Sequence, residues 1–255
     1  PAGNLEKLKI AFVYGADAVY LGGELYSLRA GAGNFNLKEM EEGINFAHRL
    51  GKKVYVTVNI FAHNQDLVFL PNYLKKLADL KVDGLIVADP AIINLVQDLK
   101  LDLKIHLSTQ ANTTNWASVN FWQKNGVKRI VLARELSIKE IKEIKDKTTV
   151  ELEAFVHGAM CMAYSGRCLL SSFLTSRSAN RGACTHPCRW RYHLVEKNRP
   201  EEFFPIEEDE RGTYILSSKD LAMITHIPEL AELGLTTWKI EGRMKSIHYV
   251  ATVTK

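Results

Sequence analysis

Four cysteines carry the most specific chemistry in this sequence. Cys161, Cys168, Cys184 and Cys188 fall within 28 residues, and the rest of the 255-residue chain contains no cysteine. Thiolates bind zinc and iron–sulfur clusters, and clustered cysteines in a reducing compartment are more often metal ligands than disulfide partners. The four cysteines therefore predict one shared metal centre.

The spacing of the cysteines favours an iron–sulfur cluster. Six, fifteen and three residues separate successive cysteines, whereas zinc sites usually offer tight pairs. An iron–sulfur cluster accepts four thiolates from an irregular loop. We therefore expect a 4Fe-4S cluster, with zinc as the alternative and unliganded cysteines as a third possibility.

A nucleophilic cysteine is a rival use of the same residues. His157 precedes Cys161 by four positions, and a catalytic thiolate needs a base of this kind. The sequence contains neither an HExxH nor a GxSxG motif, so it shows no machinery for peptide hydrolysis.

The order of the expected elements predicts a (β/α)8 TIM-type barrel. Short β-branched runs alternate with amphipathic helical patterns, which is typical of parallel βαβ units. The seven expected strands are 17–21, 53–58, 84–88, 104–108, 129–133, 150–155 and 237–240. Because the chain opens on a helical pattern, we expect the first of eight strands before Pro1. The rival is an open doubly wound sheet, but no Gly-rich phosphate turn follows any strand.

The whole chain, 1–255, is expected to form one catalytic domain with one long insertion. Residues 158–235 interrupt the repeat after the 150–155 strand and contain all four cysteines. Within the insertion, runs at 191–195 and 214–216 predict a β-hairpin whose tip is the acidic stretch 201–211.

Polar residues lie near the carboxyl ends of the expected strands, where a barrel carries its active site. The candidates for catalysis are His157, Gln110 and Glu241. The candidates for binding a ligand at this end are Arg134, Arg243 and Lys239, whose cationic side chains favour an acidic small molecule. The alternative is that the two arginines pair with Glu135 and Glu241.

Positive charge is concentrated in the insertion. The chain has a net charge of +4, but residues 161–200 contain seven Lys or Arg and one Glu. A local basic field favours polyanions or acidic small molecules. The predicted phosphate contacts are Arg177, Arg181, Arg189 and Arg191, and Trp190 or Tyr192 could stack a base. The alternative is a solvated loop whose charges confer solubility and whose aromatic side chains pack in the core.

No stretch reaches the roughly 18–20 unbroken apolar residues that a membrane helix needs, and no leader pattern opens the chain. We therefore expect a cytoplasmic protein with no membrane partner.

The segment 153–171, EAFVHGAMCMAYSGRCLLS, is similar to the signature of the collagenase-like peptidases, family U-32. Further similar segments are PAGN at 1–4, RAGAGNF at 29–35, SKDL at 218–221 and KIEGRMK at 239–245. The segment 184–192, CTHPCRWRY, most resembles the branch that hydroxylates tRNA. Other relatives hydroxylate a ribosomal RNA cytidine or take part in oxygen-independent ubiquinone synthesis.

The resemblance implies a barrel, a four-cysteine iron–sulfur centre and C5-hydroxylation of the wobble uridine of tRNA, with prephenate required. The implied partners are the tRNA anticodon loop, a small dicarboxylate, and a second copy or a paralogue in an oligomer. The small C-terminal β-domain that the family often carries is expected to be absent from this chain. The alternatives are a collagenase-like protease and a non-catalytic RNA-binding module.

Overall fold

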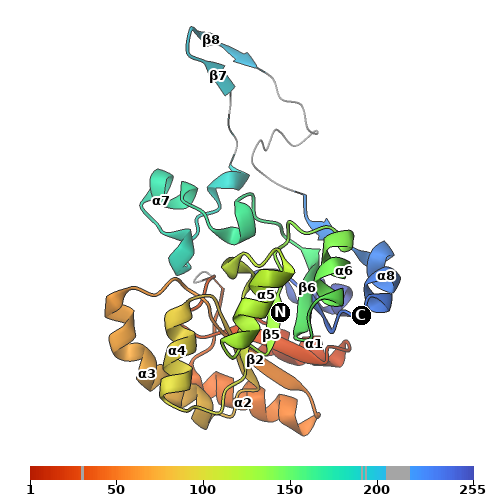
Figure 1. Ribbon diagram of the computed structural model, residues 1–255. Helices are drawn as coiled ribbons and strands as arrows, with labels where there is room; N and C mark the ends of the chain where they lie inside the picture. Colours follow the sequence, from red (N-terminus) through yellow and green to blue (C-terminus); the bar gives the residue numbers. More distant parts are fainter. Residues whose placement is uncertain (30–31, 191, 193, 205–218) are drawn as a thin grey trace.

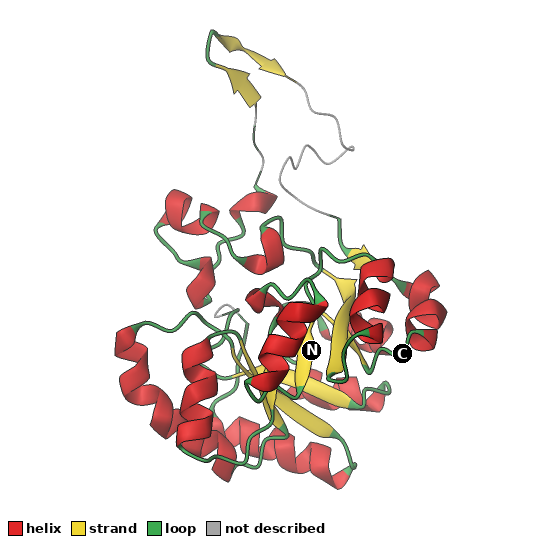
Figure 2. Cartoon of the chain, in the orientation of Figure 1, coloured by secondary structure: helices red, strands yellow, loops and turns green. Residues whose placement is uncertain are grey.

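The computed structural model describes residues 1–29, 32–190, 192, 194–204 and 219–255 (Figure 1). Within these ranges the chain is an α/β structure built around one curled, mainly parallel sheet (Figure 2). The parallel strands, in spatial order, are β1 (Ala18–Gly22), β2 (Lys53–Val58), β3 (Gly84–Val87), β4 (Ile105–Leu107), β5 (Arg129–Val131), β6 (Glu151–Gly158) and β10 (Thr237–Ile240). A two-residue strand, β9 (Leu221–Ala222), pairs antiparallel with β6.

Helices alternate with the strands, as the sequence predicts. They are α1 (Leu5–Val13), α2 (Leu37–Arg49), α3 (Asn64–Asp79), α4 (Pro90–Asp98), α5 (Trp116–Lys124), α6 (Ile138–Asp146), α8 (Ile227–Glu232) and α9 (Ile247–Thr254). Local signals set where they begin: Ser137 and Glu140 form the predicted capping box of α6, and Pro90 opens α4 after the Asp89 cap. Within the described ranges, no helix is both long and apolar enough to cross a membrane.

The sheet curls far enough to bring its two ends together. The Tyr20 hydroxyl on β1 donates a hydrogen bond to the Ile240 carbonyl on β10 at 3.0 Å. The first residues of the chain run beside β1, where Ala2 pairs in parallel with Leu21 and its N–H donates to the Tyr20 carbonyl. The predicted α/β fold with its parallel sheet is confirmed, and all seven expected strands are present. Closure into an eight-stranded barrel stays a prediction.

Side chains on the strands divide between two environments, because alternate positions point to opposite faces. The face toward the helices is aliphatic and fully buried; it includes Leu21, Val56, Leu85, Leu107, Ile130 and Leu152. The concave face is aromatic and polar; it includes Tyr20, Tyr55, His106, Glu153 and Lys239. Contacts across the concave side join these residues, with the Lys239 ammonium 4.2 Å from the Tyr20 ring centre.

The insertion after β6 rises above the sheet and carries α7 (Leu170–Thr175) and several single 3₁₀ turns (Figure 1). It also carries a hairpin of β7 (Leu194–Glu196) and β8 (Arg199–Phe204). The predicted position of the hairpin turn was wrong, because the chain turns at 197–198, where Asn198 favours a tight turn. Residues 201–204 therefore form a strand rather than the expected tip. The expected strand at 214–216 lies outside the described residues.

Gly158 lets the end of β6 pass close to the segment that follows β10. Its φ is +112°, and a Cβ atom added there would lie 2.7 Å from the Glu241 carbonyl oxygen. We expect Gly158→Ala to lower the free energy of unfolding by about 3 kcal/mol, because left-handed backbone strain and overpacking add. Denaturant unfolding measures this loss.

Gly15→Ala is the matched control for this prediction. Gly15 has nearly the same φ, +107°, but an added Cβ would meet no heavy atom within 4 Å. Its loss should be only about 1 kcal/mol, from the backbone conformation alone. Equal losses for the two variants would show that the approach to Glu241 is not tight.

Candidate functional site

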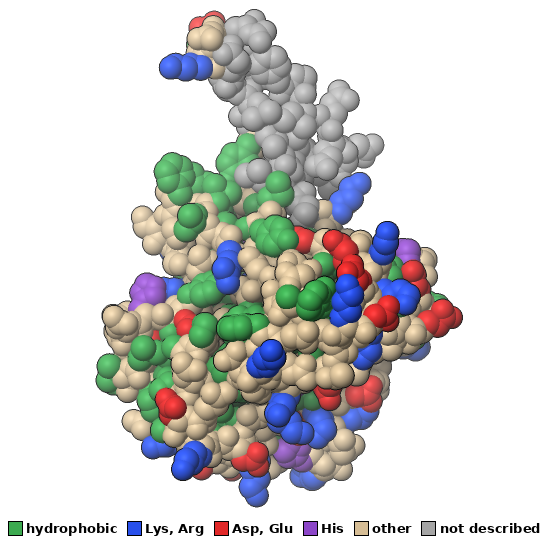
Figure 3. Space-filling view, in the orientation of Figure 1, with side chains coloured by type: hydrophobic (Ala, Val, Ile, Leu, Met, Phe, Trp, Pro, Cys, Tyr) green, Lys and Arg blue, Asp and Glu red, His purple; other side chains and the backbone are tan. Residues whose placement is uncertain are grey.

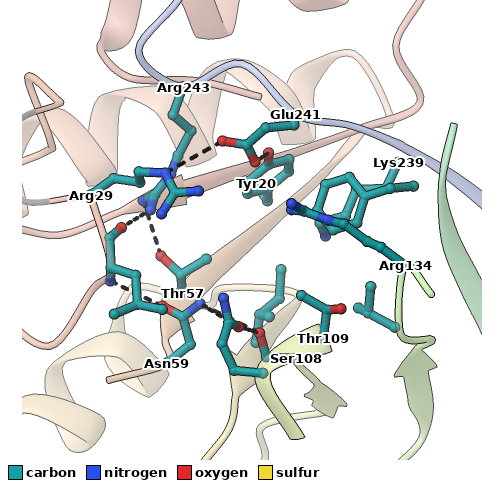
Figure 4. Close-up of a pocket in the computed structure, with 15 residues that line it drawn as sticks. Tyr20, Arg29, Thr57, Asn59, Ser108, Thr109, Arg134, Lys239, Glu241 and Arg243 are labelled. Atoms are coloured by element: carbon teal, nitrogen blue, oxygen red, sulfur yellow. Dashed lines mark hydrogen bonds and ion pairs between the residues drawn. The ribbon is translucent and has the colours of Figure 1, made fainter. Parts of the chain in front are cut away.

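A cavity lies at the carboxyl ends of the parallel strands, inside the curl of the sheet (Figure 4). Its volume of about 40 Å³ gives room for a few water molecules. The polar residues that line it are Tyr20, Arg29, Thr57, Asn59, Ser108, Thr109, Gln110, Arg134, Lys239, Glu241 and Arg243. They come from the ends of β1, β2, β4 and β10 and from the loops beyond the strands, which is where the sequence predicts an active site.

Glu241 is the carboxylate of this cavity. Its side chain lies 3.5 Å from Arg29 Nε and accepts a hydrogen bond from the Tyr20 hydroxyl at 3.1 Å. Burial alone would raise the pKa of Glu241, but the nearby Arg29, Arg134 and Arg243 together hold that pKa below its ordinary value. Burial and Glu241 also raise the pKa of Tyr20 well above its usual range. At neutral pH the pair is therefore a protonated phenol donating to an ionised carboxylate.

The Arg243 guanidinium is hydrogen-bonded to residues in the wall of the cavity. Arg243 is 3% exposed, and Nη1 donates to Ser27 Oγ at 2.9 Å and to Thr57 Oγ1 at 3.2 Å, while Nη2 donates to the Leu28 carbonyl. These bonds tie the loop after β1 to β2. Burial lowers the pKa of Arg243, yet a guanidinium keeps its proton in proteins.

Of Arg29, Arg134 and Arg243, Arg134 still has a hydrogen-bond donor without a partner among the described residues. Its guanidinium carbon lies 4.1 Å from the Phe155 ring centre, and Nη1 donates to the Ala159 carbonyl at 3.3 Å. Its Nε is buried and has no hydrogen-bond partner among the described residues. The predicted alternative, an ion pair with Glu135, is wrong here because Glu135 instead accepts hydrogen bonds from Ser165 N–H and Oγ. Burial lowers the pKa of Arg134, and Arg29 lowers it further.

The cavity carries an excess of positive charge. Lys239 lines it but is paired with the buried Glu153, which also lies 3.6 Å from Arg129. Arg29, Arg134, Lys239 and Arg243 line the cavity. Among the described residues, the Glu241 carboxylate and the Glu153 partner of Lys239 stand against these four cations, which leaves an excess of two positive charges there. Such a site suits a small dianion.

The structure brings together most of the candidate residues that were predicted near the carboxyl ends of the strands. Gln110, Glu241, Arg134, Lys239 and Arg243 all line the cavity. His157 does not line it; the centre of its ring lies 5.8 Å from that of Tyr249 on α9. Arg29 was not predicted, because it lies seven positions beyond the end of β1, in a loop whose path the strand pattern does not determine. The RAGAGNF segment, which begins at this residue, was the one signal for it.

All four cysteines are free thiols and partly buried. Burial raises the pKa of the Cys188 thiol, and the neighbouring Cys161, Cys184 and Cys168 raise it further. The thiols therefore lie close enough to interact electrostatically. Glu241 is the main group that raises the pKa of Arg29, and Cys184 and Cys161 contribute in the same direction, so these two cysteines lie within electrostatic range of the cavity.

The four free thiols are a ligand set that either an iron–sulfur cluster or a zinc ion accepts. In the part of the chain that the structure describes, no three His, Cys, Asp or Glu side chains are grouped closely enough to hold one metal ion. The choice between a cluster and zinc stays a prediction.

Side-chain contacts fasten the insertion to helix α3 and to the loops beyond β4 and β5. Arg181 makes a bidentate ion pair with Asp66, at 2.7 and 3.1 Å. Arg167 Nε donates to the Gln110 carbonyl at 2.8 Å, and Ser165 binds Glu135. Arg181, a predicted phosphate contact, is therefore an anchor of the insertion, because Asp66 already occupies both of its terminal nitrogens.

The other predicted phosphate contacts differ in how they are placed. Arg177 is exposed, and Arg189 donates to the Met160 carbonyl at 3.2 Å. Arg191 lies outside the described residues. Of the two aromatic candidates, Trp190 is 42% exposed, whereas the Tyr192 hydroxyl donates to the Pro187 carbonyl at 2.7 Å.

We expect Asp66→Asn to loosen the insertion, since it replaces a charged bidentate contact worth about 2 kcal/mol. Amide hydrogen exchange across residues 161–190 should quicken, while exchange in the strands should not change. Hydrogen bonds from Arg181 and from the His63 N–H lower the pKa of Asp66. The contribution of the pair is therefore full above the ordinary pKa of an aspartate, about 4, and is lost as pH falls through the lowered pKa.

Asp17→Asn is the control, because Asp17 also pairs with a cation, Lys52 at 2.8 Å, but its side chain is 96% exposed. It should leave exchange in the insertion unchanged. Equal exchange in the two variants would mean that Asp66 does not hold the insertion in place.

Two curated relatives are named for RNA modification. tRNA hydroxylation protein P1 of Bacillus subtilis (strain 168) is 52% identical over 253 residues, which are 99% of this chain and 60% of that protein. tRNA hydroxylation protein P of Escherichia coli (strain K12) is 44% identical over 291 residues, covering 98% of this chain and 64% of that protein. The chain thus spans about three fifths of the length of these relatives.

A solved structure has a similar fold. The U32 peptidase Mk0906 superposes with a TM-score of 0.57 at 17% sequence identity, over 90% of this chain and 86% of that chain. Residues 3–255 match the sequence profile described as Peptidase family U32. The match covers nearly the whole chain, and the chain therefore belongs to peptidase family U32.

Proposed function

We propose that this chain is the core of an RNA hydroxylase that adds a hydroxyl group at C5 of the wobble uridine of tRNA. The observation that carries the proposal is a positively charged cavity whose Arg29 lies within electrostatic range of Cys161 and Cys184, two of the four free cysteines. Relatives named as tRNA hydroxylation proteins, 52% and 44% identical to this chain, support RNA as the substrate class.

The proposed small-molecule partner is prephenate, a dicarboxylate. Its two carboxylates match the charge excess of the cavity, and a guanidinium binds a carboxylate through two parallel hydrogen bonds. Arg134 supports this role because its buried Nε has no partner in the described part of the chain. Arg29 lies across from it and has Glu241 as its carboxylate partner.

The proposed cofactor is a 4Fe-4S cluster, held by Cys161, Cys168, Cys184 and Cys188. When bound, it would supply electron-transfer chemistry next to the cavity. Beside the cofactor, Tyr20 keeps its proton and donates a hydrogen bond to Glu241, which stays ionised. Burial of both groups keeps bulk water away from the reacting centre.

The insertion is the proposed RNA surface. Arg177 is exposed there, and the insertion also exposes apolar and aromatic side chains on which unpaired bases could stack (Figure 3). These exposed side chains are Met162, Tyr164, Leu169, Phe173, Leu174 and Trp190. A loop nucleotide leaves its stack at low cost, so a wobble base can enter a pocket beneath such a surface.

We also propose that the sheet closes as an eight-stranded barrel. The parallel pairing of Ala2 with Leu21 places the first residues of the chain beside β1, and Gly3 lies close to the Arg243 carbonyl that follows β10. A strand leading into Ala2 would then fill the place between β10 and β1.

The function is tested in a strain that lacks its tRNA hydroxylation proteins and carries the full-length protein. Mass spectrometry of tRNA nucleosides should show 5-hydroxyuridine derivatives with the wild-type protein. Cys188→Ser should abolish them, because a cluster needs all four thiolates. Anaerobically purified wild-type protein should contain iron and acid-labile sulfide, and the variant much less of both.

Ala183→Ser is the control, since it introduces the same serine side chain next to Cys184 and leaves all four thiolates in place. It should retain both modification and iron. Zinc without sulfide in anaerobic protein would contradict the cluster. Cleavage of gelatin by the purified full-length protein, abolished by one point substitution, would favour the peptidase alternative over RNA modification.

The dicarboxylate is tested with Arg134→Gln in the full-length protein. Losing a buried charge-assisted contact costs about 2–5 kcal/mol, so calorimetry should show prephenate binding at least tenfold weaker. Arg49→Gln is the control, because Arg49 is exposed on α2, on the helical side of the sheet. Unchanged binding by a folded Arg134→Gln variant would remove Arg134 from the site.

A further inference from the structure

Three polar side chains form a hydrogen-bonded chain along one wall of the cavity. We call Asn59, Ser108 and Gln110 the amide chain. The Asn59 amide nitrogen lies 3.4 Å from Ser108 Oγ and 3.4 Å from Gln110 Oε1, and the Ser108 hydroxyl donates to Gln110 Oε1. All three residues are less than 9% exposed. Their hydrogen-bonding directions therefore depend on one another and not on solvent.

One backbone group fixes the direction of the whole amide chain. The Leu28 N–H can only donate, and it donates to Asn59 Oδ1 at 3.1 Å. The Asn59 amide nitrogen must then face the other way, toward Gln110. Because two amide nitrogens cannot hydrogen-bond to each other, Gln110 must present its Oε1 to Asn59. Gln110 Nε2, with its two N–H donors, is left pointing away from the amide chain.

Gln110 Nε2 lies near Gly166 of the insertion. A Cβ atom added to Gly166 would lie 3.5 Å from it, so the missing side chain of Gly166 leaves space there. The Gln110 backbone is held by Arg167, whose Nε donates to its carbonyl at 2.8 Å. No residue in the described ranges accepts a hydrogen bond from Nε2, and the donors are therefore fixed in position and unused.

We propose that Gln110 is a specificity-determining residue that recognises the base by donating to the O4 carbonyl of uracil. Cytosine carries an amino group at the same position, which is itself a donor. Two donors facing each other leave a buried group unpaired, and a site built around such a hydrogen bond rejects the wrong partner strongly. The inference rests on the proposed function, because it names how that site selects its nucleoside.

The test uses two tRNA substrates that differ only in the wobble base, uridine or cytidine, with the full-length protein in the deletion strain. Mass spectrometry measures the 5-hydroxylated form of each. The wild-type protein should modify uridine at least tenfold more than cytidine. Gln110→Glu offers acceptors in place of the donors, and the ratio should fall at least tenfold. Gln110→Met removes the donors without adding acceptors, so uridine modification should fall and cytidine should not gain.

Asn59→Asp tests the direction of the amide chain without altering Gln110. An aspartate still accepts from the Leu28 N–H, but it now offers an acceptor to Gln110. The Gln110 amide should therefore turn over and present Oε1 to the base, which shifts the preference toward cytidine. Thermal unfolding and iron content show whether each variant is folded and loaded, and the Gln110→Met variant keeps the test decisive if a carboxylate variant fails to fold.

Unchanged uridine-to-cytidine ratios in folded, active variants would overturn the inference while leaving the proposed function standing. Weaker prephenate binding in Gln110→Met, with the base preference retained, would assign Gln110 to the acid and overturn it as well. Absence of any hydroxylated nucleoside with the wild-type protein would instead refute the proposed function, and this inference with it.

Discussion

The site depends on one buried interaction, the Glu241 carboxylate among three arginines. An isolated carboxylate in this position would be costly to bury, and so would the guanidinium groups around it. Glu241 balances part of the positive charge of these arginines. It also accepts a hydrogen bond from the Tyr20 hydroxyl on β1. Because Glu241 directly follows β10, this hydrogen bond joins the two ends of the curled sheet. The residual positive charge is what makes the cavity suitable for an acidic ligand.

The sequence predicted those site residues whose positions depend on the order and direction of the strands. The carboxyl ends of parallel strands meet at one edge, so Gln110, Arg134 and Glu241 were expected together, and they are. The sequence did not predict contacts between residues that are far apart in the chain. Arg181 was expected to contact phosphate, but it meets Asp66, which lies 115 positions earlier in the chain. No local pattern reveals such a partner, and a loop residue such as Arg29 is equally hidden.

The insertion and the cavity form one functional unit. The Gln110 carbonyl accepts a hydrogen bond from Arg167 of the insertion, and the Gln110 side chain lines the cavity. One residue therefore contacts both the insertion and the cavity. Arg29 pairs with Glu241, which is the main group that raises its pKa, and Cys184 and Cys161 contribute in the same direction. Arg29 therefore lies within electrostatic range of both the cavity carboxylate and the insertion.

The two faces of the sheet have separate tasks, and this separation has an evolutionary consequence. Aliphatic residues such as Leu85 and Ile130 lie on the helix side and supply the hydrophobic stability. Residues such as Ser108 and Gln110 lie beyond β4, on the cavity side. Substitutions there can alter which molecules are accepted while the shell that folds the protein stays intact. One ancestral scaffold could in this way diversify into enzymes for different substrates without first passing through unstable intermediates.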